Sequence, residues 1–242
     1  MVRGAIEDFC SELVRRVPSY VESILLGRKD VVGRRKLQQD PEQFVNQYFV
    51  WPVCEYLRYD YVSEWYHEGH GGSTDLYIRN ADAPIFGECK RVNHYKRAIR
   101  DLRDYLDHRT ANTTLGVATD GISWLLIREP GDQRKNVEVL EFHSFRGAFF
   151  DYLVSIDALE PELEGERVLW NSSVGKIAKQ PYGRYGKLHR ESVEESVELF
   201  EDKFSTENLS RYSTDKTHEE PITAFHDQLS GSSEKPTLDD FS

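Results

Sequence analysis

A single predicted β-hairpin constrains the fold of this chain more than any other feature. Two runs of strand-forming residues, 74–79 and 84–90, are separated by the segment 80–83, whose Asn and Asp favour a tight reversal of the chain. The antiparallel register that closes this turn also places Asp75 opposite Glu88. Residues opposed in this way have Cβ atoms about 4.5–5.5 Å apart, so the two carboxylates would lie side by side.

The alternation of side chains along both strands gives the hairpin two different faces. The apolar face would pack on helices and consists of Leu76, Ile78, Ile85, Gly87 and Cys89. The other face carries the polar groups and consists of Asp75, Tyr77, Phe86, Glu88 and Lys90. Lys90 therefore points the same way as the two carboxylates.

Two neighbouring carboxylates repel each other, and one takes up a proton unless a cation is present. A hard divalent cation such as Mg²⁺ relieves the repulsion, accepts oxygen ligands and retains water molecules. Lys90 can stabilise a developing negative charge or help to deprotonate an attacking water. Because such metal ions promote the hydrolysis of anionic esters, the pattern predicts a metal-dependent phosphodiesterase.

The flanking sequence predicts an α/β domain with a mixed central sheet flanked by helices. Asp40-Pro41-Glu42 is a strong helix start, and Thr119-Asp120-Gly121 predicts a second hairpin turn. The predicted helices cover 5–17, 19–27, 40–57 with a bend or break near Pro52, 95–109, 144–158 and 191–204. The predicted strands cover 59–66, 74–79, 84–90, 114–118, 122–128 and 137–142.

The spacing D-x(12)-E-x-K, preceded by a helix that bears Glu42, resembles the PD-(D/E)xK nuclease superfamily. Within it, residues 40–130 are similar to the N-terminal endonuclease domain of type I restriction enzyme motor subunits and its standalone relatives. The similar stretches are DPEQFVNQYFVWPVCEYLRYD, the hairpin, the following helix and TLGVATDGISWLLIRE. The resemblance implies a restriction-endonuclease-like fold and a DNA endonuclease active in restriction, defence or repair.

The same resemblance implies roles for individual residues. Asp75, Glu88 and Glu42 would hold Mg²⁺ or Mn²⁺, and Lys90 would be catalytic. Thr74 stands where many members of the superfamily have proline. Asp101 stands where a glutamine often precedes a tyrosine, here Tyr105, by four residues. An acid at that position would repel a phosphate unless it binds a second metal or turns away.

Nucleic-acid contacts are predicted on the helix that follows the hairpin. Lys96, Arg100 and Arg103 lie within about 60° of one another on a helical wheel, and Tyr105 lies further along the same helix. They could follow a phosphate backbone beside the metal. Asp104 interrupts the stripe, so a merely solvated face explains it equally well.

The distribution of charge divides the chain. The net charge is −11, but the last 52 residues hold 14 acidic and 4 basic residues, so the preceding part is nearly neutral and can carry a local positive surface. We expect four segments: 1–38, helical; 39–158, nuclease-like; 159–204, basic and aromatic with a short helix; and 205–242, an acidic disordered tail. The basic, glycine-punctuated segment 27–36 is interpreted as a linker.

Several classes of protein are excluded or disfavoured. The chain contains no run of 18 apolar residues, so no membrane span is predicted. Its three widely spaced cysteines form neither a disulfide framework nor a zinc knuckle. The first residues lack the pattern of a secretory signal, so we expect a cytoplasmic protein. The chain contains no G-x(4)-G-K-[ST] motif, so no ATP-driven motor of the P-loop type is predicted.

Three alternatives share these features. The first is a catalytically inactive nucleic-acid-binding or scaffold module of the same fold. The second is a nuclease directed at RNA, and the third is a protein-interaction domain in which the hairpin acids are incidental. Partner proteins of a defence system, or a homodimer formed through the apolar stripe between Ile6 and Val17, are compatible with each of them.

Overall fold

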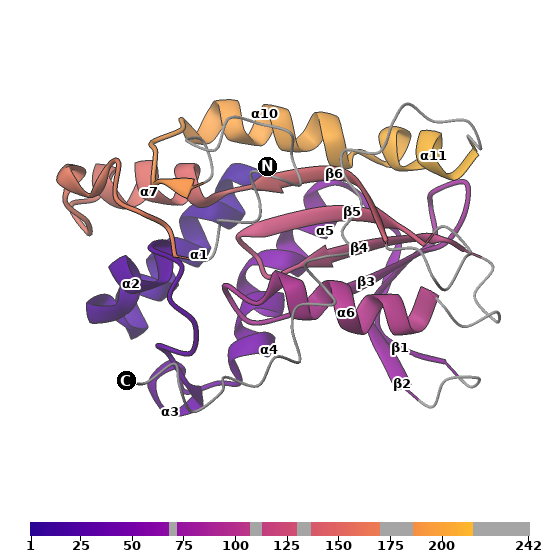
Figure 1. Ribbon diagram of the computed structural model, residues 1–242, viewed down its shortest axis with the longest axis horizontal. Coiled ribbons are helices and arrows are strands. Elements are labelled where there is room, and N and C mark those ends of the chain that lie inside the picture. Colours follow the sequence, from indigo (N-terminus) through magenta and orange to yellow (C-terminus); the bar gives the residue numbers. More distant parts are fainter. Residues whose placement is uncertain (68–71, 107–112, 130–136, 170–185, 215–242) are drawn as a thin grey trace, which may run out of the picture.

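The fold is built on a six-stranded mixed sheet whose strands lie in sequence order (Figure 1). It was obtained as a computed structural model, which describes residues 1–67, 72–106, 113–129, 137–169 and 186–214. The strands are β1 (Tyr61–His67), β2 (Gly72–Ile78), β3 (Ile85–Cys89), β4 (Leu115–Thr119), β5 (Ser123–Arg128) and β6 (Glu138–Ser144). Only β3 and β4 pair in parallel, and the other neighbours are antiparallel. The expected α/β class with a mixed sheet is confirmed.

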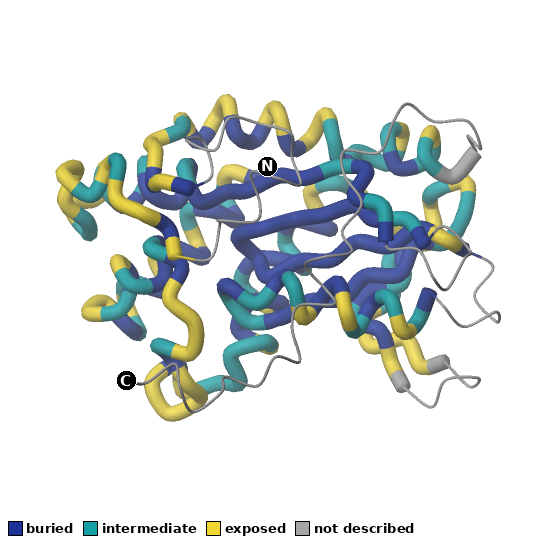
Figure 2. Tube along the Cα trace, viewed as in Figure 1, coloured by how far each residue is buried: buried dark blue, intermediate teal, exposed yellow. Residues whose placement is uncertain are grey.

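The β2–β3 hairpin has the register that the sequence predicts. Leu76 pairs with Gly87 and Ile78 pairs with Ile85, and continuing the same register by one residue sets Asp75 opposite Glu88. Both faces of β3 are buried, because helices cover the sheet on either side. Figure 2 shows that this burial extends across β4, β5 and most of β6.

Helix α6 (Tyr95–Leu106) forms the crossover between the parallel strands β3 and β4 and packs on both. Gly116 permits its close approach, because a Cβ at this position would lie 2.6 Å from Cδ2 of Leu102. Gly116 pairs with Phe86, and the next pair on the same face joins Glu88 to Ala118. Phe86 and Glu88 therefore lie on the sheet face that α6 covers.

The opposite face of the sheet packs on the terminal helices. These are α1 (Val2–Arg16), η1 (Pro18–Tyr20), α2 (Val21–Leu25), α4 (Pro41–Val45), the π-helical turn η2 (Asn46–Val50), α5 (Trp51–Tyr56), α7 (Arg146–Ser155) and α10 (Val193–Phe204). An aromatic cluster joins α1, α4, η2 and α7 through Phe9, Phe44, Phe49, Phe145 and Phe149. Residues from 1–38 and 193–209 thus belong to the same core as the sheet.

The structure departs from the sequence predictions in several places. The segment interpreted as a linker contains the short helix α3 (Arg34–Leu37), and the 3₁₀ turn η3 (Pro161–Leu163) follows α7. The expected disorder from residue 205 is wrong for its first part, because α11 (Thr206–Thr214) forms there. Burial of Leu209 explains this helix. Residues 215–242 and most of the basic and aromatic stretch 165–190 lie outside the described residues.

Two further observations complete the fold. The helix predicted to bend or break near Pro52 does not break there, but it passes through the π-helical turn η2 just before that proline. Within the described ranges, no helix combines the length and the apolar character needed to cross a membrane.

Candidate active site

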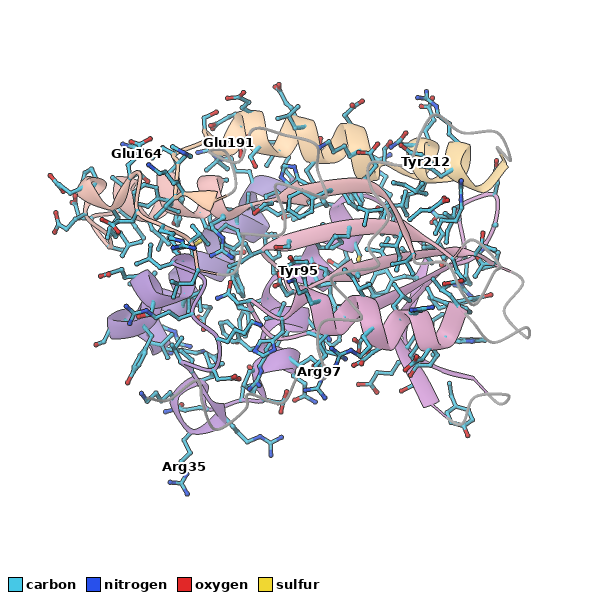
Figure 3. All side chains as sticks on the ribbon, viewed as in Figure 1. Arg35, Tyr95, Arg97, Glu164, Glu191 and Tyr212 are labelled. Carbon is cyan, nitrogen blue, oxygen red and sulfur yellow. The ribbon has the colours of Figure 1, made fainter. Side chains whose placement is uncertain are left out.

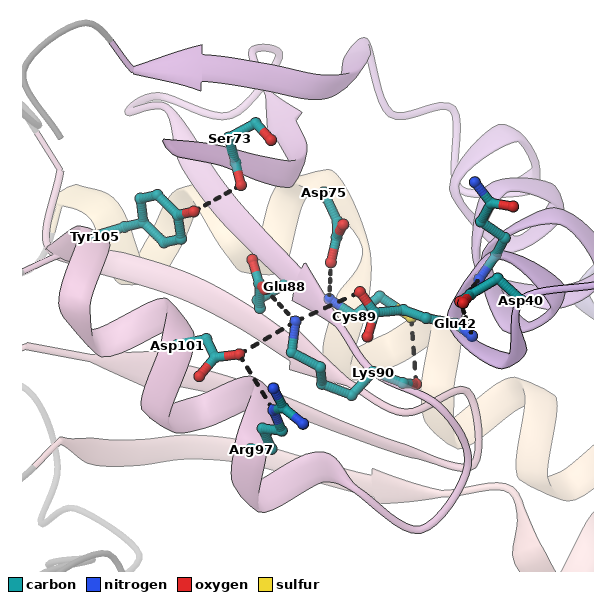
Figure 4. A network of polar contacts seen from close by, with 11 residues as sticks. Asp40, Glu42, Ser73, Asp75, Glu88, Cys89, Lys90, Arg97, Asp101 and Tyr105 are labelled. Carbon is teal, nitrogen blue, oxygen red and sulfur yellow. Dashed lines mark hydrogen bonds and ion pairs between the residues drawn. The ribbon is translucent and has the colours of Figure 1, made fainter. Parts of the chain in front are cut away.

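Four elements bring the predicted site residues together (Figure 4). Glu42 lies in the first turn of α4, whose N-cap Asp40 accepts hydrogen bonds from the backbone N–H groups of residues 42 and 43. Asp75 comes from β2 and Glu88 from β3, and Lys90 follows directly after β3. Asp101 of α6 completes the group. Lys90 lies outside the regular elements, but its backbone N–H donates to the carbonyl of Thr119 at 2.9 Å, which fixes the position of its main chain beside β4.

Lys90 lies at the centre of this group. Its Nζ donates to Oε1 of Glu88 at 2.5 Å and lies 3.3 Å from Oδ2 of Asp101 and 3.5 Å from Oε1 of Glu42. Burial lowers the pKa of Lys90, but the surrounding carboxylates, above all Glu88, outweigh it and raise the pKa above its ordinary value. Lys90 is therefore an ammonium ion near neutral pH.

Asp75 is fixed by the neighbouring strand. Its Oδ2 accepts a hydrogen bond of 2.7 Å from the backbone N–H of Cys89, whose side chain is buried on the opposite face. Burial raises the pKa of Asp75, and this hydrogen bond opposes the rise. The carboxylate is thus oriented, yet its charge is costly in the absence of a further cation.

At Glu88 the opposition between burial, which raises the pKa, and favourable contacts, which lower it, is stronger than at Asp75. Burial, followed by the charge of Asp75, raises its pKa to about 8 although Lys90 acts in the other direction. Its Oε2 is buried and has no hydrogen-bond partner within the described residues. Burial also raises the pKa of Glu42. These three carboxylates therefore hold more negative charge than Lys90 neutralises.

The donor set has the chemistry of a hard-cation site. Carboxylate oxygens are the ligands that Mg²⁺ and Mn²⁺ prefer, and Glu88 Oε2 provides an oxygen that no other described residue engages by a hydrogen bond. Within the described part of the chain, no three aspartate, glutamate, histidine or cysteine side chains lie close enough together to hold a metal ion as they stand. Lys90 explains this, since its ammonium group lies between Glu88, Glu42 and Asp101.

The four predicted nucleic-acid contacts on α6 have different surroundings. Arg103 lies 3.8 Å from the buried carboxylate of Glu129, and the hydroxyl of Tyr105 donates to the carbonyl of Ser73 at 2.7 Å. Lys96 is half-buried, and burial together with the charge of Lys29 lowers its pKa. Arg100 is exposed. Lys96 and Arg100 thus remain the better placed of the four for a phosphate backbone.

The segment interpreted as a linker supplies cations that the sequence analysis missed. It is docked on the start of α6, because Asn93 Nδ2 donates to the carbonyl of Arg28 at 3.0 Å and Asp30 forms an ion pair with Arg91. We call the resulting basic surface the cationic ridge; it consists of Arg28, Lys29, Lys96, Arg97 and Arg100. Figure 3 shows Arg97 on the same edge of the molecule as Arg35 of α3. The dense basic charge of residues 27–36 was the available signal.

A second buried polar cluster lies at the start of α6. Asp120 accepts from the backbone N–H groups of Tyr95 at 3.0 Å and Ser123 at 2.8 Å. Arg146 donates to the carbonyls of Ile24 and Leu25, and to Oδ1 of Asn93 at 2.7 Å. Burial raises the pKa of Asp120 to about 6, below neutral pH, and the backbone donors and Arg146 oppose the rise. This cluster ties α2, α6 and α7 to the sheet.

Comparisons with known proteins add no family to this description. No family model, curated protein or solved structure matches the chain. The chemistry of the site is therefore argued from its own residues.

Proposed function

We propose that this protein is a metal-dependent endonuclease that hydrolyses phosphodiester bonds in DNA. The observation that carries the proposal is the convergence of Glu42, Asp75 and Glu88 around the ammonium group of Lys90. Three carboxylates with raised pKa values and one unsatisfied oxygen are costly to bury. Such a cost is expected where a cation binds and where chemistry requires it.

Each residue has a role in this proposal. Glu42, Asp75 and Glu88 would hold Mg²⁺ or Mn²⁺, which supplies Lewis acidity and a bound water of lowered pKa. Lys90 keeps its proton because of its raised pKa, so it is suited to donate a hydrogen bond to a phosphate oxygen rather than to act as a base. Asp101 faces Lys90 at 3.3 Å and would position it. The cationic ridge would hold the flanking phosphates.

One observation favours a second candidate, a nucleic-acid-binding module without catalysis. Lys90 already contacts three of the carboxylates, so the group is partly neutralised without a metal ion. In that case the protein would bind DNA through the cationic ridge, and divalent ions would have no effect.

A digestion experiment separates the two. Plasmid and single-stranded DNA are incubated with Mn²⁺ and the purified protein, with Lys90→Ala and Asp75→Ala as test variants. Lys187→Ala, which removes an exposed lysine from another part of the surface, is the matched control. We expect cleavage by the wild type and the control alone. Cleavage that persists in both test variants would remove this mechanism, and DNA binding without cleavage by the wild type would support the second candidate.

A further inference from the structure

The β1–β2 hairpin presents aromatic rings beside the candidate active site. The Trp65 ring stacks on Tyr77, with centroids 4.8 Å apart and an angle of 16° between the rings. Tyr77 in turn packs on Phe86 at 5.5 Å. Trp65 remains 39% exposed and the neighbouring Tyr66 is 60% exposed. We call Trp65 and Tyr77 the aromatic shelf.

The shelf lies on the same side of the sheet as the carboxylates. Tyr77 follows Asp75 by two residues, so both side chains share one face of β2 about 7 Å apart along the strand. Phe86 stands in the same relation to Glu88 on β3. Glu64, the neighbour of Trp65, falls opposite Asp75 in the β1–β2 register, between the pairs Ser63–Leu76 and Trp65–Thr74, which places this part of β1 close to the site.

The backbone of β1 is distorted where Trp65 enters the shelf. Glu64 has a φ of 54°, the left-handed region that side chains other than glycine rarely adopt. It is the one residue with such a value inside a described strand. Trp65 pairs with Thr74, whose side chain is fully buried, yet its own ring lies over Tyr77. An unfavourable conformation that keeps a large apolar ring in solvent points to a ligand.

From this arrangement we infer that the aromatic shelf stacks on unpaired bases, so that the substrate is single-stranded or locally unpaired DNA. The inference rests on the proposed function and names its substrate class. Aromatic rings bind single strands because every unpaired base offers a π-face, whereas the bases of a duplex are stacked on one another. The cationic ridge provides positive charge for the phosphates of the same strand. A strand that contacts both the shelf and the ridge would cross the carboxylates between them.

Binding measured without cleavage tests the inference. Fluorescence anisotropy follows a labelled oligothymidylate and a duplex of equal length in Ca²⁺, which replaces Mg²⁺ to suppress hydrolysis. The variants are Trp65→Ala and Trp65→Phe. Tyr56→Ala, which removes an aromatic residue exposed on α5, is the matched control. Far-ultraviolet circular dichroism and thermal unfolding show whether each variant is folded.

We expect Trp65→Ala to weaken single-strand binding about tenfold and duplex binding by less than twofold, while Trp65→Phe and Tyr56→Ala retain affinity. Equal single-strand affinity of Trp65→Ala and the wild type, or no single-strand binding by the wild type, would overturn the inference. If the wild type binds single strands through Trp65 but never cleaves them, the inference stands and the nuclease proposal fails. If both the wild type and Trp65→Ala cleave duplex DNA, and the wild type binds single strands no more tightly than duplex DNA, the nuclease proposal stands and this inference fails.

Discussion

Two buried polar clusters lie beside α6, one around Asp120 and one around Lys90, and their buried charges are compensated to different degrees. Around Asp120, both carboxylate oxygens accept backbone N–H groups and Arg146 lies close enough to affect the pKa. Around Lys90, several carboxylates compete for one ammonium group, and Glu88 Oε2 has no hydrogen-bond partner among the described residues. The first cluster is balanced in charge, with one carboxylate and one guanidinium group, whereas in the second several carboxylates share one ammonium group.

The difference in charge balance predicts different effects of mutation in the two clusters. A balanced cluster stabilises the packing of the elements that it joins, and its removal should cost stability. Under the proposed function, the excess negative charge around Lys90 costs stability in the free protein and would be offset by the cation that binds there. Variants in both clusters can therefore break or sharpen this comparison.

The largest effect is expected for Glu88→Gln. Removing one of the mutually repelling buried carboxylates should lower the cleavage rate about a thousandfold, since a metal ligand is lost. The free energy of unfolding should stay constant or rise, because a buried carboxyl group whose ionisation is unfavourable is replaced by a neutral amide. Initial rates in Mn²⁺ and urea unfolding measure the two quantities, with the exposed Glu160→Gln as control. Undiminished cleavage would contradict the assignment of Glu88.

The opposite result is expected for Arg146→Met, which keeps most of the side-chain volume. The carbonyls of Ile24 and Leu25 and the amide oxygen of Asn93 would lose their donor, so we expect the protein to lose about 3 kcal/mol of stability. Urea unfolding measures this loss. Arg211→Met, which alters an exposed ion pair within α11, should change stability by less than about 0.5 kcal/mol. An equally small change for Arg146 would show that the cluster of Asp120 and Arg146 is not structural.

Divalent ions should distinguish the clusters directly. Mg²⁺ or Mn²⁺ at about a hundred times the dissociation constant should stabilise the wild type by about 2.7 kcal/mol, seen as a higher thermal midpoint. Asp75→Asn should abolish this response, because it removes a ligand. Asp120→Asn should retain it although its starting stability is lower. A response that is lost only in Asp120→Asn would reverse the comparison.

The smallest effects are expected on the cationic ridge. Lys29→Ala and Arg100→Ala should each weaken DNA binding severalfold and reduce the slope of log affinity against log salt by about 0.9 on duplex DNA and about 0.7 on single strands. Binding isotherms at several salt concentrations measure this slope. Arg79→Ala, which breaks an exposed ion pair with Asp60, should leave the slope of log affinity against log salt unchanged. An equal change in the control would mean that the ridge is not the binding surface.

Local patterns in the sequence are sufficient to predict much of the sheet. The period-two alternation and the turn before Pro84 determine the β2–β3 register, because a shift of one residue would turn Leu76 and Ile78 out of the core. The start of α4 at Asp40 follows equally from its N-cap. Such features depend on residues that are neighbours in sequence, so they can be read without the structure.

Contacts between distant residues could not be predicted in the same way. Asp101 faces Lys90 because α6 packs closely over Gly116, and helix periodicity alone does not reveal that orientation. Arg146 meets carbonyls that lie more than a hundred residues earlier. The docking of residues 28–30 on α6 likewise depends on Asn93 and Arg91, and no short-range pattern connects them.

The late return of the chain to the sheet has a consequence for biosynthesis. Trp124 of β5 is fully buried and packs on Phe200 and Phe204 of α10, and Tyr59 donates to the carbonyl of Phe204. A ribosome-bound chain that ends before α10 would leave this indole ring uncovered. The sheet that presents the acidic residues thus reaches its final packing only after α10 has been synthesised.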